Sequence, residues 1–546
     1  MKGNSIDMNT MVSRARDNPV KCGLIILAFM ICTPAGVFAE TPETERELVA
    51  AFTPTELVLD PVHSYRTQEL QIATAIYEGL VSYHPASLRP VPSVAWSWDV
   101  SEDGRTYSFH LRRRAQYSNG DRVTAQDFRA SWLRVISPEE QGEYSFLFDV
   151  IKGVSAFRNG DIDDPDLVGI RAESDTLLVV ELNKPAGHFL SMLCHMSFVP
   201  VHPQYQDSVG WDTRPALVTN GPFTIERRSR REMILKKNEH YWDEKNVLLD
   251  RIRLRFISNA ATITDGINAG EIHWAETANL QTLMNPRAVQ FSPLFGTTYL
   301  YFLTDTEPWS DPRVRRGLAL LISWGEIRSE SGTFSTDRIV PGLEFLPDVV
   351  GIREKNIEEG LALLADAGFP EGKGLPEILI QVPSDSTAEV IAGFLKSEWE
   401  DALPLDVRVQ PLDYSVYTAE LKKKDFTLAT STWIGDFADP LTFLLLWTSA
   451  SNLNDAHYRN AEYDRMVEDA MAEQTETRFE KLAQVEKKLL DDAVVIPLSH
   501  PASFNVVDLG KIDGWYQNFM DIHPFKTIRF KKARTRPDLA RALMSR

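Results

Sequence analysis

Apolar and polar residues alternate with a period of two in several short segments, which is the pattern of a half-buried strand. In residues 251–256 the apolar side chains fall on one face and the arginines on the other. The same alternation runs through residues 106–111, and residues 177–182 form a fuller apolar run. Asp103-Gly104, which precedes one of these segments, has the composition of a tight turn. The pattern predicts strands, some of them joined as hairpins.

Apolar residues that recur every three or four positions predict helices elsewhere in the chain. Asn356 stands where a helix cap is expected, and Gly368 ends the segment that follows it. The buried face of this helix is predicted to consist of Ile357, Leu361 and Leu364.

A second predicted helix begins at Ser386 and lies between two strand-like runs, residues 378–382 and 405–411. Its inward-facing side chains are predicted to be Ile391, Phe394 and Leu395. Strand, helix and strand in this order favour a right-handed parallel crossover. Residues 479–489 and 494–498 predict a further helix and strand near the C-terminus. The chain therefore has a mixed α/β pattern.

Composition narrows the class of protein. With 546 residues, 43% hydrophobic and 25% charged, the chain is large enough for about two to four domains with sizeable cores. Disordered, collagen-like and coiled-coil proteins are excluded. The net charge is −19, and no long basic run is present, so no nucleic-acid partner is expected. No low-complexity linker separates the segments, which indicates interleaved domains.

The N-terminal residues have the pattern of a secretory signal. Several basic residues precede the apolar run from Cys22 to Cys32, and a breaker and Ala39 follow it. This pattern predicts a signal peptide of residues 1–39, cleaved after Ala39, and an exported, periplasmic protein. An uncleaved anchor and a lipid anchor at Cys32 are the alternatives. The apolar run is shorter than the ~20 residues of a spanning helix.

No catalytic or cofactor motif is found in the sequence. Four residues with metal-binding or nucleophilic side chains cluster in an apolar segment: His188, Cys194, His195 and His202. Their spacing matches no standard zinc signature. Packed core is the main interpretation, and a metal site or a Cys–His catalytic pair are the alternatives. We expect a binding protein without metal or cofactor, and no enzyme.

Five blocks of sequence carry a family resemblance. They lie within residues 59–80, 92–132, 219–243, 311–316 and 433–440, and include Tyr77-Glu78-Gly79-Leu80 and Trp433-Ile434-Gly435-Asp436. In order and spacing these blocks resemble the extracytoplasmic solute-binding proteins of family 5, the oligopeptide- and dipeptide-binding proteins of ABC transporters.

The resemblance implies a bilobal α/β fold of the periplasmic-binding-protein type (type II), with an additional domain inserted into one lobe. On this chain, the signal peptide would be followed by four parts: lobe I at 40–80, 199–283 and 515–530, the inserted domain at 81–198, lobe II at 284–514 and a basic C-terminal tail at 531–546.

The resemblance also implies a function. The two lobes would close on a peptide or a similar amine-bearing solute and deliver it to an ABC permease and its ATPase. A monomer is expected. The alternatives are an exported binder of a non-peptide solute, such as a sugar, a metal chelate or a signalling peptide, and an exported hydrolase.

The resemblance places Asp436 at the position whose carboxylate receives the α-ammonium of the ligand. Asp439, next to Pro440, is predicted instead to cap the following helix. Thr430 stands where some relatives have an arginine for the peptide carboxylate, so this chain departs from them at that point.

Other candidates for the ligand site come from both lobes. Backbone groups near Tyr65, Arg66 and Thr67 on one lobe would face those of Ser431, Thr432 and Trp433 on the other, as in strand addition. Such bonds do not depend on side chains, so we expect broad specificity and micromolar affinity (~−8 kcal/mol). Four further residues are candidates for the pocket wall: Tyr144, Asn220, Tyr299 and Tyr301.

Overall fold

A computed structural model describes residues 46–531, apart from positions 65, 141, 143, 207, 209, 344, 345, 452 and 474. The predicted signal peptide, the candidate Tyr65 and almost all of the predicted basic tail lie outside the described residues. A search of the described part of the chain finds no helix with the length and hydropathy of a membrane span.

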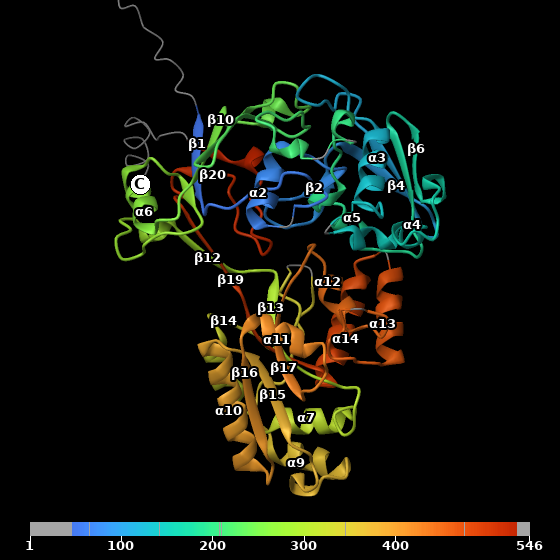
Figure 1. The fold of residues 1–546 in the computed structure, drawn as a ribbon, viewed down its shortest axis with the longest axis vertical. Coiled ribbons are helices and arrows are strands. Elements are labelled where there is room, and N and C mark those ends of the chain that lie inside the picture. The colour runs from blue at the N-terminus through green and yellow to red at the C-terminus, as the bar shows by residue number, and fades with distance from the viewer. Residues whose placement is uncertain are drawn as a thin grey trace, which may run out of the picture. The chain divides into compact units, whose positions relative to one another are not determined.

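A seven-stranded sheet is built from segments far apart in the sequence (Figure 1). Its central strand, β1, is parallel to β10 and β11, whereas the other pairs are antiparallel. In sheet order the strands are β12 (Val289–Pro293), β19 (Ala502–Val507), β11 (Trp274–Ala275), β1 (Glu47–Phe52), β10 (Arg251–Phe256), β9 (Glu232–Lys237) and β8 (Phe223–Arg228). The prediction for residues 251–256 is confirmed: Ile252 and Leu254 are buried, and Arg253 pairs with acidic residues of neighbouring strands.

A six-stranded mixed sheet forms the second large layer. In sheet order its strands are β14 (Phe334–Ser335), β18 (Val495–His500), β13 (Gly296–Phe302), β17 (Leu428–Ile434), β15 (Ile378–Pro383) and β16 (Val407–Leu412). The predicted crossover is confirmed, because β15 and β16 are parallel and α10 (Ser386–Ala402) joins them. The remaining helices of this part are α7 (Pro312–Leu320), α8 (Trp324–Ser331), α9 (Ile357–Asp366), α11 (Tyr414–Leu421), α12 (Leu441–Leu444), α13 (Ala461–Ala472) and α14 (Thr477–Asp491).

Two helix predictions need correction in detail. Helix α10 begins at Ser386, as predicted, and the side chain of Asp385 caps it by accepting from the backbone N–H groups of the first turn. Phe394 and Ile357 were expected to face inward but are 38% and 48% exposed. On the same two helices Leu395 and Leu364, which were also expected to face inward, are fully buried. The apolar faces of the two helices are therefore narrower than the sequence predicted.

A four-stranded antiparallel sheet lies wholly inside the range predicted for the inserted domain. Its strands, in sheet order, are β4 (Ala95–Val100), β5 (Thr106–Leu111), β7 (Leu177–Glu181) and β6 (Ile170–Ser174). Helix α3 (Ala125–Val135) packs against β6 and β7, and its Trp132 is fully buried in their shared core. The remaining α-helices and strands of the described residues are α2 (Thr67–Ile76), β2 (Val81–Tyr83), β3 (Pro90–Pro92), α4 (Val154–Arg158), α5 (Phe189–Met192), α6 (Ala260–Ala269), β20 (Ile512–Asp513) and β21 (Arg529–Phe530).

The two large sheets share a pair of continuous chain segments. Strand β12 leads directly into β13, and β18 leads directly into β19. Leu294 N–H donates to the carbonyl of Pro501 at 2.7 Å, which ties the two segments together between the sheets. Figure 1 shows β12 and β19 side by side at this passage. The range predicted for lobe II, 284–514, thus includes two strands that pair in the first sheet, because a sequence range does not reveal which sheet a strand joins.

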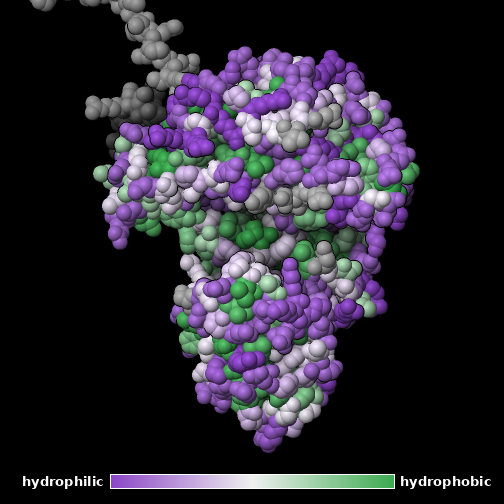
Figure 2. Space-filling model, in the orientation of Figure 1, coloured by the Kyte–Doolittle hydropathy of each residue, from purple (hydrophilic) through white to green (hydrophobic). Residues whose placement is uncertain are grey.

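Hydrophilic residues cover most of the face drawn in Figure 2, with smaller apolar areas between them. This distribution agrees with a chain that is 25% charged and carries a net charge of −19.

Candidate functional site

Strand β17 holds three of the predicted site residues, and its pleat separates them. Ser431 and Trp433 lie opposite Tyr299 and Thr297 of β13, and directly opposite residues share a face of the sheet. Thr432 points to the other face, where its hydroxyl oxygen lies 2.8 Å from that of Thr298. The three neighbours therefore cannot present their side chains to one ligand, although their backbone groups lie along one line.

The outer half of β17 is paired on one side only. Strand β15 pairs with β17 only at Leu428 and Ala429, which lie opposite Ile380 and Gln381. Beyond that point, within the described residues, no strand pairs with β17 on the β15 side. Tyr417 of α11, which the sequence did not single out, occupies the first free position: its hydroxyl donates to the carbonyl of Thr430 and accepts from its N–H at 3.1 Å. On this side the backbone groups of Thr432 and Ile434 remain available to an extended ligand, because the groups of successive residues in a strand point to alternate sides.

Tyr299 and Tyr301 form part of a buried aromatic cluster on one face of this sheet. The Tyr299 ring lies 6.2 Å from that of Tyr301 and 5.5 Å from that of Trp447, measured between centroids. Tyr301 is 1% exposed, and its hydroxyl has no hydrogen-bond partner within the described residues. The two tyrosines of β13 therefore belong to the buried core on one face of the sheet, and Trp433 of the neighbouring strand β17 packs against the same cluster.

Asp436 follows β17 in a loop whose backbone is held from two sides. Gly435 N–H donates to the carbonyl of Phe295 at 2.7 Å, and Asp436 N–H donates to the hydroxyl of Thr442 at 3.0 Å. A side chain at Gly435 would collide with both neighbours, since a Cβ there would lie 2.5 Å from Phe295 Cδ1 and 2.7 Å from Thr442 Cγ2. The loop thus holds Asp436 in a defined position.

The carboxylate of Asp436 is half-buried, and burial raises its pKa to about 6. Within the described part of the chain, no lysine, arginine or histidine forms an ion pair with it. A buried carboxylate without a cation is costly, because it gives up hydration without an opposite charge in return. A cation from outside the protein would therefore stabilise this carboxylate.

Asp439, three residues further on, has a different environment. It is 3% exposed and accepts two hydrogen bonds from Arg478 of α14, both at 2.7 Å. Leu441 N–H donates to the same carboxylate at 3.0 Å, which confirms the predicted role at the start of α12. Arg478 was not predicted, because nothing in the sequence connects it with a residue 39 positions away. Asp439 is therefore a structural residue, fully paired inside the protein.

The loop is also attached to the part of the chain that contains the four-stranded sheet. Ala438 N–H donates to the hydroxyl of Tyr83 at 3.0 Å, and that hydroxyl donates to the carbonyl of Ser191 at 3.0 Å. The ring of Phe437 stacks on that of His188 with a centroid distance of 5.7 Å. Contacts on both sides thus restrict residues 437–439, next to Asp436.

The histidine and cysteine cluster of the sequence is dispersed into local packing. His195 caps a short turn by accepting from Ser197 N–H, and His202 lies 3.0 Å from the carboxylate of Asp121. Burial lowers the pKa of His188 and of His195 to about 4 and raises the pKa of the Cys194 thiol. A search of the described residues finds no group of three or more potential metal ligands. The packed-core interpretation describes these residues best.

Arg66 and Thr67 stand at the start of α2, and Thr67 is exposed. The Arg66 guanidinium donates to the carboxylate of Glu69 at 3.0 Å, and Arg66 N–H donates to the other oxygen of that carboxylate at 2.9 Å. The Arg66 side chain is thus engaged within its own helix. Its neighbour Tyr65 is outside the described residues.

Asn220 and Tyr144 have structural contacts of their own. The Asn220 carboxamide accepts from Glu78 N–H at 3.1 Å and donates to the Glu78 carbonyl at 2.7 Å, so both ends of the amide are used. The Tyr144 ring packs on His195 with a centroid distance of 4.3 Å, at the edge of the core around the four-stranded sheet. Neither is brought to Asp436 by any described contact of its side chain.

The Glu78 side chain joins several of the sequence blocks. It accepts from the Tyr241 hydroxyl, from Trp242 Nε1 and from the Lys526 ammonium, the last at 3.0 Å. The guanidinium of Arg112 lies 3.9 Å above the Trp242 ring. This network thus brings three of the five blocks, those within residues 59–80, 92–132 and 219–243, together around one buried carboxylate.

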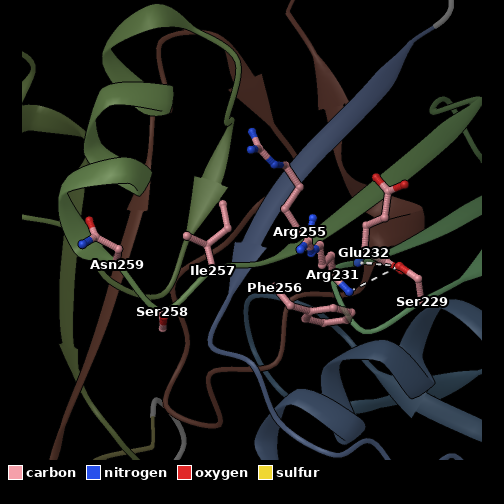
Figure 3. Close-up of a pocket in the computed structure, with 8 residues that line it drawn as sticks. All are labelled: Ser229, Arg231, Glu232, Arg255, Phe256, Ile257, Ser258 and Asn259. Atoms are coloured by element: carbon pink, nitrogen blue, oxygen red, sulfur yellow. Dashed lines mark hydrogen bonds between the residues drawn. The ribbon is translucent and has the colours of Figure 1, made fainter.

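A concavity of about 560 Å³ lies at the turn between β8 and β9 and the end of β10, and Figure 3 shows the residues that line it. Ser229, Arg231, Arg255 and Phe256 are among its lining residues. The Ser229 hydroxyl accepts from two backbone N–H groups of the turn, at 3.1 and 3.3 Å, and so is used to shape that turn. None of the predicted ligand residues lines this concavity, so the candidate site remains at residues 431–436.

Comparison with known proteins identifies similar proteins along most of the chain. A family model described as bacterial extracellular solute-binding proteins, family 5 Middle, matches residues 89–455. The oligopeptide-binding protein OppA of Bacillus subtilis is 27% identical over 453 residues, covering 77% of this chain and 81% of that protein. The periplasmic murein peptide-binding protein MppA of Escherichia coli is 28% identical over 501 residues, covering 87% and 92%.

Solved structures give the same result for the fold. The structure of MppA, a periplasmic murein tripeptide-binding protein in its unliganded open form, matches with a TM-score of 0.78 at 26% identity. The match covers 90% of this chain and 99% of that chain. These comparisons confirm the family resemblance and the predicted fold class, a bilobal α/β fold of the periplasmic-binding-protein type.

Proposed function

This chain belongs to the bacterial extracellular solute-binding proteins of family 5, and we propose that it captures a short peptide, or a similar solute with a free amine, for an ABC importer. Relatives named as oligopeptide- and murein peptide-binding proteins support this solute class. The observation that carries the proposal is Asp436, a half-buried carboxylate without a cation of its own among the described residues.

Ligand binding at Asp436 follows from the cost of its burial. In the free protein, solvent still reaches the carboxylate and partly hydrates it. A closing lobe would remove that water, and the α-ammonium of a peptide would replace it with an opposite charge and up to three N–H donors. Because the loop is held by Phe295 and Thr442, little conformational freedom would be lost on binding.

Backbone contacts would hold the rest of the ligand. The side of residues 431–434 that no described strand covers offers N–H and C=O groups to an extended chain. A peptide whose ammonium reaches Asp436 would lie along this strand, and its side chains would point alternately to either side. Since backbone bonds are independent of side chains, the site favours many peptides over one, with affinities in the micromolar range (~−8 kcal/mol).

The remaining parts of the proposal follow the family. Lobe I is proposed to contribute the segment around Arg66 and Thr67, and the carrier is proposed to act as a monomer in the periplasm after cleavage of residues 1–39. It would deliver its solute to a permease driven by an ATPase, and would carry out no chemical step itself. The sugar, metal-chelate and hydrolase alternatives have no comparable observation in the described residues to favour them.

Calorimetric titration with matched peptides tests the proposed function. Trialanine and N-acetyl-trialanine differ only at the amino terminus. We expect micromolar binding of trialanine and at least tenfold weaker binding of the acetylated peptide. Mass spectrometry of solute released from denatured, freshly purified protein gives an independent result, in which peptides are expected. Released solutes without any amine, together with equal affinities for the two trialanines, would contradict the proposal.

A further inference from the structure

A second carboxylate lies where the parallel strands of the seven-stranded sheet end. Glu276 directly follows β11, which is parallel to β1, so the carboxyl ends of both strands lie at the same edge of the sheet. Glu276 N–H donates to the carbonyl of Ala51 in β1 at 3.4 Å. In open α/β sheets, ligands bind beyond the carboxyl ends of parallel strands.

The same edge holds the start of α2. The side-chain amide of Gln68 donates to the carboxylate of Glu276 at 3.3 Å. Gln68 immediately follows Arg66 and Thr67, the segment that the proposed function assigns to ligand contact in lobe I. Glu276 is therefore a direct neighbour of that segment, on a different stretch of the chain.

The surroundings of Glu276 supply hydrogen-bond donors but no positive charge. Burial and, to a smaller extent, the nearby Asp521 carboxylate raise the pKa of Glu276 to about 7, whereas hydrogen bonds from the Gln68 amide and Thr53 N–H act to lower it. Asp521 is itself engaged with Asn505 at 2.8 Å and with His523 at 3.0 Å. No lysine or arginine of the described chain forms an ion pair with Glu276.

Several buried carboxylates of this protein are paired with an arginine of the protein itself. Asp60 accepts two hydrogen bonds from Arg134, at 3.0 and 2.7 Å, and Asp439 is paired with Arg478 in the same way. Glu486, which is fully buried, forms no ion pair within the described residues and is held instead by the N–H groups of Ile339 and Val340. Glu276 and Asp436 differ from both kinds because they are half-buried, so that a ligand can reach them, and neither forms an ion pair within the described residues.

We propose that Glu276 is a specificity residue that receives a second cation of the solute, the ammonium or guanidinium of a basic side chain. The inference rests on the proposed function, because it takes Asp436 as the partner of the α-ammonium. Together the two carboxylates would select peptides that carry one positive charge more than a neutral tripeptide. Glu276 and the basic side chain would form an ion pair with hydrogen bonds in a partly desolvated site. Such pairs discriminate strongly between charged and uncharged ligands.

The test compares lysine peptides with their ε-acetylated forms, which keep the length of the side chain and remove its charge. One lysine is placed in turn at each of the three positions of trialanine, and each peptide is titrated calorimetrically against the full-length mature protein. The variants are Glu276→Gln and, as a control with the same change in net charge, Glu271→Gln. Glu271 is exposed and precedes β11, at the other end of that strand.

For the wild-type protein and for Glu271→Gln, we expect at least one lysine position at which the charged peptide binds ten times more tightly than its acetylated form. In Glu276→Gln this ratio is expected to fall below about threefold, while trialanine binds as before. An unchanged ratio in Glu276→Gln at every position would overturn the inference. Failure of all peptides to bind the wild-type protein would instead contradict the proposed function, so the two failures are distinguishable. Circular dichroism and the trialanine affinity show whether the variant is folded.

Discussion

Replacing Asp436 by asparagine separates the binding role of this residue from its effect on the fold. The substitution keeps the size of the side chain and removes its charge. Burial raises the pKa of Asp436 from 3.8 to about 6, so keeping it ionised at neutral pH costs the folded protein about 3 kcal/mol at most, at ~1.4 kcal/mol for each pKa unit. Asp436→Asn removes this cost, and the ligand-free variant is therefore expected to be as stable as the wild type or more stable.

Affinity is expected to change in the opposite direction. Without the carboxylate, a bound α-ammonium has no opposite charge in a partly desolvated site. This loss weakens the free energy of binding by about 2–5 kcal/mol. This corresponds to roughly 30-fold to several-thousand-fold weaker binding of a peptide with a free amino terminus. The N-acetylated peptide, which has no ammonium, is expected to bind both proteins equally.

Asp439→Asn is the matched control. It breaks a buried ion pair with Arg478, both partners being 3% exposed, and breaking such a pair costs about 3–5 kcal/mol of stability. Urea unfolding should therefore show a large loss for Asp439→Asn and none for Asp436→Asn, whereas calorimetric titration should show the larger loss of affinity for Asp436→Asn. If Asp436→Asn binds a free-amine peptide as tightly as the wild type, Asp436 is not part of the site and the reasoning is refuted.

Three further predictions concern the loop and the fold around it. A bound ammonium favours ionised Asp436, whose pKa in the free protein is about 6. Affinity for trialanine should therefore rise as pH increases from 5 to 7 and fall again once the α-amino group of the peptide, with an ordinary pKa of about 8, loses its proton. A flat calorimetric profile would contradict this. Gly435→Ala would place a Cβ 2.5 Å from Phe295 Cδ1, so we expect the free energy of unfolding measured in urea to fall by about 1–3 kcal/mol. Every amine peptide should also bind more weakly. A variant with unchanged stability and affinity would show that the loop tolerates displacement. Glu78→Gln removes the charge partner of Lys526, and we expect it to lower the free energy of unfolding in urea by about 3 kcal/mol. The control Glu239→Gln changes an exposed residue and should have no effect. Equal stabilities of the two variants would exclude a structural role of this network.

Local patterns predicted the elements of this protein well. The alternation in residues 251–256 specified a strand and its buried face, and the order of strand, helix and strand from residue 378 specified a parallel crossover. These features depend on the side-chain period and the local handedness of the chain, which the sequence contains directly. The inward orientation of Phe394 and Ile357 was wrong, because the width of a buried face depends on what packs against it.

The family blocks determined the fold class and the importance of Asp436, but only the tertiary structure separated the roles of neighbouring residues. Asp436 and Asp439 are both aspartates in one short loop, yet Arg478 from a distant helix pairs with one, while the other has no ion-pairing cation among the described residues. The same holds for β12 and β19, which join the first sheet although they lie in the sequence range of the second lobe. Glu276 likewise stands out only once β1, β11 and α2 meet at one edge. Whether a carboxylate is paired or available depends on contacts between residues far apart in the chain, and no local pattern of residues encodes them.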